Sequence, residues 1–150
     1  MRKRCMAAVA AAFFVTPVWA GGAADNAITF VSQADFEDTT FAVESAILDK
    51  GLVIDFTSHT GEMLERTRAD IGSDIVLFQS ADIYNFCSAR LSRKMMEADI
   101  MNIVYCPYHI FVMQQAGSDQ VLVGFAKMPE GPMKEVEALL TEIVQEALDQ

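Results

Sequence analysis

The stretch IVYCPYHIFVMQQAGSDQVLVGFA, residues 103–126, contains two runs of strand-forming residues on either side of a turn. Residues 103–113 and 120–126 are rich in β-branched and aromatic side chains, which favour strands. The segment Gln115-Ala116-Gly117-Ser118-Asp119 between them has the small and polar residues of a hairpin loop. These residues therefore predict a β-hairpin in the second half of the chain.

Outside this hairpin, apolar periodicity predicts strands and helices in alternation. The expected strands cover residues 27–31, 52–56 and 74–78, and the expected helices cover residues 36–50, 61–71, 82–98 and a last segment opened by Pro132. The predicted order is β-α-β-α-β-α-β-β-α. This order indicates one α+β domain over residues 27–150, with a mixed or antiparallel sheet and helices packed on it in two layers.

The first 20 residues have the pattern of a cleaved signal peptide. Arg2, Lys3 and Arg4 precede an apolar stretch, and small residues stand where a signal peptidase cleaves, after Ala20. About 15 apolar residues are too few for a helix that spans a bilayer, which needs ~20. We therefore expect export to the periplasm, a flexible N-terminal segment at residues 21–26, and no membrane anchor on the mature protein.

Composition restricts the classes of partner. The chain has 150 residues, 52% of them hydrophobic and 21% charged, which is typical of one folded domain. Its net charge of -10 would repel nucleic acid and anionic lipid, so neither is an expected partner. Phosphate-loop, dinucleotide, zinc-protease and nucleophile-elbow patterns are absent from the sequence. We therefore expect no cofactor, and the sequence leans against an enzyme.

Export also affects how the cysteines are interpreted. Cys5 is removed with the leader, which leaves Cys87 and Cys106 in an oxidising compartment. Cys87 shares a helical stripe with Tyr84, Leu91 and Met95 in the predicted helix 82–98, so it is expected to face the sheet. Counted from the end of this predicted helix, the rise per residue of a helix and that of the returning strand place Cys87 and Cys106 at similar heights along the helix axis. Three interpretations remain open: a structural disulfide, two buried thiols, or a functional pair that is redox-active or binds a soft metal, for which Met95 and His109 are weak additional ligands.

The stretch FCSARLSRKMMEADIMNIVYCPY, residues 86–108, resembles the family called domain of unknown function 302. Lys50-Gly51-Leu52 before a strand and Ile75-Val76-Leu77-Phe78 before a cysteine-bearing segment support the resemblance, which covers residues 27–148. This chain looks like an exported branch of the family with two cysteines. The resemblance implies a two-layer α+β fold and makes a homodimer plausible, and it implies no activity.

Two functions follow as hypotheses. In the first, the protein is an exported, non-catalytic binding or accessory protein, which holds a small ligand or a periplasmic protein. Its candidate binding residues are Arg90, Arg93, Tyr105, Tyr108 and His109. In the alternative, Cys87 and Cys106 make it a periplasmic thiol-redox or soft-metal-binding protein.

Overall fold

The structure is a computed structural model, and it describes residues 23–150. The predicted signal peptide lies outside the described residues. Of the segment predicted to be flexible, Ala23–Asn26 forms a short 3-10 helix, η1. No helix in residues 23–150 is both long enough and apolar enough to cross a membrane.

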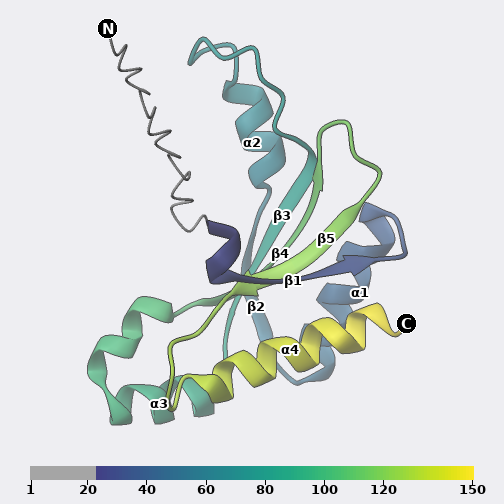
Figure 1. The fold of residues 1–150 in the computed structure, drawn as a ribbon. Helices are drawn as coiled ribbons and strands as arrows, with labels where there is room; N and C mark the ends of the chain where they lie inside the picture. The colour runs from purple at the N-terminus through teal and green to yellow at the C-terminus, as the bar shows by residue number, and fades with distance from the viewer. Residues whose placement is uncertain (1–22) are drawn as a thin grey trace, which may run out of the picture.

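The order of elements is the predicted one. The strands are β1 (Ala27–Ser32), β2 (Val53–Ser58), β3 (Phe78–Cys87), β4 (Tyr108–Gln115) and β5 (Val121–Ala126). The helices are α1 (Phe36–Asp49), α2 (Thr60–Thr67), α3 (Ala89–Ala98), the 3-10 helix η2 (Ile100–Tyr105) and α4 (Lys134–Leu148). The strands form one antiparallel sheet in the order β1-β5-β4-β3-β2, so the predicted α+β class is confirmed (Figure 1).

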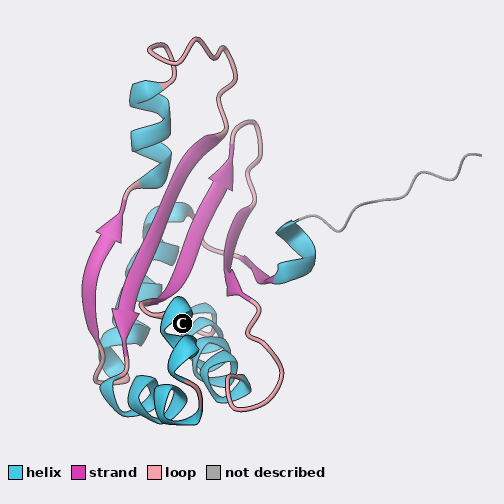
Figure 2. Cartoon of the chain, turned by 90° about the vertical axis from the view of Figure 1, so that its left-hand side faces the viewer, coloured by secondary structure: helices cyan, strands magenta, loops and turns pink. Residues whose placement is uncertain are grey.

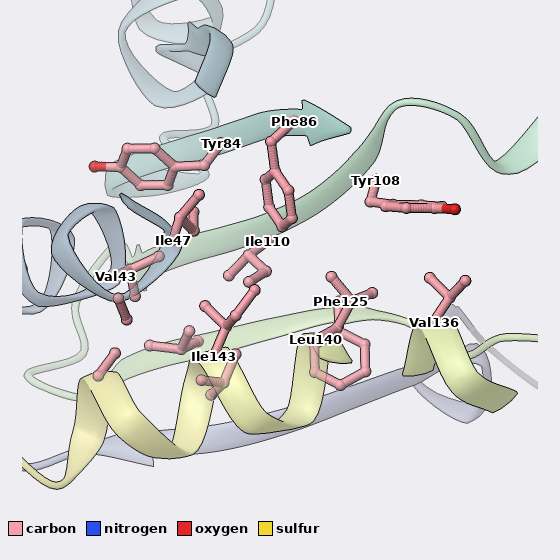
Figure 3. Close-up of a cluster of buried hydrophobic side chains, with 14 of the residues drawn as sticks. Val43, Ile47, Tyr84, Phe86, Tyr108, Ile110, Phe125, Val136, Leu140 and Ile143 are labelled. Atoms are coloured by element: carbon pink, nitrogen blue, oxygen red, sulfur yellow. The ribbon is translucent and has the colours of Figure 1, made fainter. Parts of the chain in front are cut away.

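The core lies between one face of this sheet and the helices α1 and α4. Alternate residues of β4 and β5 point into it, among them Ile110 and Phe125, which are fully buried. Figure 3 shows these side chains and those of Leu140 and Ile143 in α4 pointing toward one another. In Figure 2 a group of helices gathers behind and below the strands, and α2 lies apart from it at the upper end. The residues between these core positions on β4, such as Phe111, lie on the opposite face and are only half-buried.

The first helix begins and ends as the sequence indicates. The Asp35 carboxylate accepts a hydrogen bond from the Asp38 backbone N–H at 2.9 Å, which satisfies one of the free donors at the start of α1. Gly51 follows the helix with a φ of 71°, a conformation that glycine adopts without strain. These two ends fix where the chain turns from α1 into β2.

Two predicted elements in the middle of the chain are wrong. Residues 74–77 form an exposed loop and no buried strand, and residues 82–87, predicted as the start of a helix, belong to β3. The helix starts only after Ser88, whose side-chain oxygen accepts from the Leu91 backbone N–H. The helical spacing of Tyr84 with Leu91 was misleading because β3 pairs with both β2 and β4, and this tertiary pairing outweighs local periodicity.

The bounds of the other helices and strands differ less from the predicted ones. The second helix ends at Thr67, four residues earlier than predicted. The strand predicted over residues 103–113 begins only at Tyr108, because residues 100–105 form η2. The hairpin loop and the last strand lie where the sequence places them.

Candidate functional site

The two cysteines of the described chain meet at one end of the sheet. Cys87 is the last residue of β3, and Cys106 lies between η2 and β4. Because β3 and β4 are antiparallel neighbours in which Phe86 pairs with Tyr108, their ends bring the cysteines together. The two Sγ atoms are 3.2 Å apart and both cysteines are free thiols. We call these two residues the thiol pair.

A hydroxyl network lies against the thiol pair. The Ser92 hydroxyl of α3 is 3.5 Å from the Cys106 Sγ atom and donates a hydrogen bond to the Tyr108 hydroxyl oxygen at 3.2 Å. Tyr108 is 2% exposed, and this burial raises its pKa. Ser92 thereby links α3 to Cys106 and to Tyr108, and both cysteines of the thiol pair are half-buried.

The surroundings of Cys87 disfavour its thiolate. Burial is the main cause that raises the pKa of Cys87 to about 12, followed by its hydrogen bond with Cys106 and the nearby charge of Asp55. The thiolate is the nucleophile in thiol chemistry, so Cys87 reacts slowly at neutral pH. Cys87 therefore differs from low-pKa thiols placed beside basic groups.

The raised pKa of Cys87 predicts an unusual pH dependence of its alkylation rate. In the reduced protein, alkylation of Cys87 by iodoacetamide at pH 8 is expected to be at least about tenfold slower than alkylation of a cysteine peptide, whose pKa is about 8.5. The rate should still rise above pH 10. Because the folded pKa exceeds the unfolded one, the stability linked to this proton is present below about pH 8.5 and is lost as the pH rises toward about 12.

Peptide mass spectrometry over this pH range measures the alkylation rate, with unfolded protein as the control. A rate for folded protein that levels off near pH 9 would show that the Cys87 thiol is not perturbed.

The other predicted site residues do not form one surface. Arg90 and Arg93 lie on the exposed side of α3, where Arg93 pairs with Glu97 at 2.8 Å. Tyr105 packs at the edge of the core and Tyr108 inside it. His109 follows Tyr108 on β4 and therefore points to the opposite face of the sheet. The surface proposed from sequence is thus divided between two faces.

A separate cavity opens on the sheet face where His109 lies. Its volume is about 230 Å³, and it is lined by Thr60, Phe78, Ala81, Asp82, Ile83, His109, Phe111, Val112 and Met113. Burial lowers the pKa of His109, which keeps its ring neutral at pH 7. Asp82, which lines this cavity, has its Oδ1 atom 2.8 Å from Nδ1 of His59. The sequence does not reveal this contact, because the register of β3 is not visible in a single sequence.

Few additional ligands could hold a metal beside the thiol pair. No cluster of three or more histidine, cysteine, aspartate or glutamate side chains with metal-binding geometry occurs in residues 23–150. Met95, a weak candidate from sequence, is 1% exposed and belongs to the hydrophobic core. The thiol pair therefore offers two sulfur ligands, and disulfide formation is the simpler chemistry for it.

Comparisons with known proteins give one family and one fold. The model of the family described as "Domain of unknown function DUF302" matches residues 28–150. A solved structure, that of an uncharacterized conserved DUF302 protein from Bacillus stearothermophilus, superposes with a TM-score of 0.59 over 82% of this chain and 95% of that chain. The two sequences are 15% identical, so the likeness supports the fold alone. No curated protein matches the chain.

Proposed function

The chain belongs to the DUF302 family, a family defined without an activity, and from its site we propose that it is an exported thiol-redox protein whose thiol pair cycles between dithiol and disulfide. The observation that carries this proposal is the distance of 3.2 Å between the Sγ atoms of Cys87 and Cys106. A disulfide bond is about 2.05 Å long, so an approach of about 1 Å would form it.

The proposed reaction balances without a cofactor. On oxidation the two thiols lose two protons and two electrons and form one S–S bond. A disulfide in a partner accepts both electrons and both protons and becomes two thiols. In the reverse direction the Cys87–Cys106 disulfide oxidises two partner thiols.

The raised pKa of Cys87 favours one direction of electron transfer between the thiol pair and its partner. Strongly oxidising thiol proteins stabilise their reduced form, and a lowered thiol pKa is one way to do so. The raised pKa of Cys87 gives the reduced form no such stabilisation. We expect the pair to hold its disulfide firmly and, when reduced, to donate electrons to more oxidising disulfides.

The proposal includes the periplasm as the place of action. Its support is the leader pattern of residues 1–20, since cleavage after Ala20 would release the chain where disulfides persist. A homodimer, which the family resemblance makes plausible, remains part of the proposal.

The test is a redox titration of the folded protein in mixtures of reduced and oxidised dithiothreitol. We expect one two-electron transition, with two thiols lost and a mass decrease of two hydrogens. The variants Cys87→Ser and Cys106→Ser should keep the fold and show no such transition. A disulfide that dithiothreitol reduces only after the protein is unfolded would contradict a redox role and indicate a structural bridge.

One observation favours the second function, non-catalytic ligand binding. The cavity of about 230 Å³ beside His109 has mainly apolar walls and the polar groups of Thr60, Asp82 and His109 at its border. This arrangement suits a small apolar molecule with one hydrogen-bonding group. It lies on the face opposite the core, so it would act independently of the thiol pair.

A further inference from the structure

The two members of the thiol pair are placed differently in the fold. Cys87 is the last residue of β3, where it pairs with Val53 of β2, and Phe86 before it is fully buried. Cys106 lies outside the sheet, between η2 and β4, and Pro107 after it is exposed. A partner disulfide therefore meets exposed chain beside Cys106 and buried chain beside Cys87.

The surroundings disfavour a thiolate at Cys87 in particular. Burial, the hydrogen bond with Cys106 and the charge of Asp55 all raise its pKa, whereas a hydrogen bond from the Tyr108 backbone N–H, the smallest of these effects, lowers it. Cys87 therefore keeps its proton, and its S–H group can donate to the Cys106 Sγ atom 3.2 Å away. A donor at this distance stabilises a negative charge on Cys106.

The hydroxyl network of Ser92 and Tyr108 provides Cys106 with a second donor. In the reduced pair the Ser92 hydroxyl donates to the Tyr108 oxygen at 3.2 Å, so Ser92 Oγ is an acceptor for the Cys106 S–H at 3.5 Å. Burial raises the pKa of Tyr108, so its hydroxyl keeps its proton. When Cys106 loses its proton, rotation of both hydroxyls reverses the two hydrogen bonds. Tyr108 then donates to Ser92, and Ser92 donates to the thiolate.

We infer that Cys106 is the sulfur that attacks a partner disulfide, and that Ser92 and Tyr108 are positioning residues that stabilise its thiolate by this reversal of hydrogen bonds. The inference rests on the proposed redox function and assigns the roles within the thiol pair. Cys87 is the second thiol to react, and it closes the disulfide with Cys106.

The steps balance in atoms and electrons. Cys106 first loses its proton to water, and its thiolate attacks one sulfur of the partner disulfide. The S–S bond of the partner breaks, a mixed disulfide forms on Cys106, and the other partner sulfur leaves as a thiolate. This thiolate takes the proton of Cys87, whose sulfur then attacks Cys106 Sγ and releases the remaining partner sulfur, which takes up the first proton from water. Two electrons have passed to the partner, which ends as two thiols, and the pair ends as a disulfide.

The first experiment compares the two cysteines one at a time. The variant Cys87→Ser retains Cys106, and the variant Cys106→Ser retains Cys87. Each reduced protein is mixed with oxidised glutathione at pH 7, and intact mass measures the rate at which the mixed disulfide forms. We expect Cys106 to react at least about tenfold faster, because so little of Cys87 is a thiolate at this pH.

The second experiment tests the positioning role of Ser92 in the background Cys87→Ser. Ser92→Ala is expected to slow the attack by Cys106 about threefold at pH 7, because fewer sulfur atoms are then thiolates, although each remaining thiolate is more nucleophilic. The slowing should disappear above about pH 10, where a thiol ionises without a hydrogen bond. Ser92→Thr keeps a hydroxyl and should restore the rate at pH 7.

Two buried tyrosines supply a matched pair of variants in the same background. Tyr108 is 2% exposed and its hydroxyl contacts Ser92, whereas Tyr84 is 5% exposed and its hydroxyl contacts Thr40. Tyr108→Phe should therefore slow Cys106 in the same pH-dependent way as Ser92→Ala, and it tests the hydroxyl network independently of α3. Tyr84→Phe should leave the rate unchanged.

A Cys87 rate equal to or above that of Cys106 would overturn the assignment of the attacking sulfur while the redox function stands. No slowing by Ser92→Ala and Tyr108→Phe, or a slowing that persists above pH 10, would overturn the positioning role. If the unmodified pair gains no disulfide from oxidised glutathione, the proposed function fails and the inference with it.

Discussion

Replacement of Phe125 by alanine is expected to lower the free energy of unfolding by about 3–5 kcal/mol. Phe125 is fully buried in β5, and its ring centroid lies 6.5 Å from that of Phe30 in β1. Removing the ring eliminates its burial and leaves a cavity that the surrounding sheet and helix fill only in part. Urea unfolding followed by circular dichroism measures the change as a shift in midpoint with a constant slope.

The chain supplies a matched control for this substitution. Phe41 lies in α1 and is 71% exposed, so Phe41→Ala removes the same ring from a site that contributes little burial. Its effect should stay within about 0.5 kcal/mol. Similar losses for the two variants would mean that Phe125 is not in the core.

Oxidation of the thiol pair is expected to raise the free energy of unfolding by about 3 kcal/mol. The disulfide would close a loop whose ends are 19 positions apart in the chain, and closing a loop of roughly this length restricts the unfolded state by that amount. The folded state should change little, because the two Sγ atoms are already 3.2 Å apart. Guanidinium unfolding of oxidised and reduced protein, at the same pH, gives the difference.

The variant Cys106→Ser serves as the reference for this measurement. It cannot close the loop, so its stability should be the same with and without reductant and should be close to that of reduced protein. A reduced protein as stable as the oxidised one would show that bond formation strains the folded state. A serine variant that responds to reductant would show that another group is responsible.

Much of the fold could be predicted because local and tertiary signals agree in most elements. The hairpin of β4 and β5 has strand-forming residues on both sides of a glycine-containing turn. In α4, Val136, Leu140 and Ile143 repeat at helical spacing, and the structure buries all three. In such segments periodicity, turn residues and burial favour the same conformation.

The failure at residues 74–98 has a specific physical cause. Ile75 and Val76 are apolar enough for a buried strand, yet they lie exposed in a loop. The true strand β3 begins at Phe78 and contains polar residues such as Asp82 and Asn85. It is a strand because it lies between β2 and β4 and forms backbone hydrogen bonds with both. Single-sequence periodicity contains no information about those neighbours.

The candidate site was predictable only in its residue identities. The predicted export, and the two cysteines left after the predicted cleavage, made a disulfide between Cys87 and Cys106 one of three open interpretations. Their actual meeting depends on a strand end in place of the predicted helix. The burial of Tyr108 and the contact between His59 and Asp82 depend on strand register, which a one-residue shift would reverse.

The strand order has a consequence for how the chain folds. The strand β1 is synthesised first among the strands, but its neighbour in the sheet is β5, where Ala27 pairs with Ala126. The edge of the sheet therefore cannot be completed until nearly the whole polypeptide is available, and such a high contact order slows folding. A chain that emerges from its first residue onward would therefore hold β1 unpaired until β5 has been synthesised.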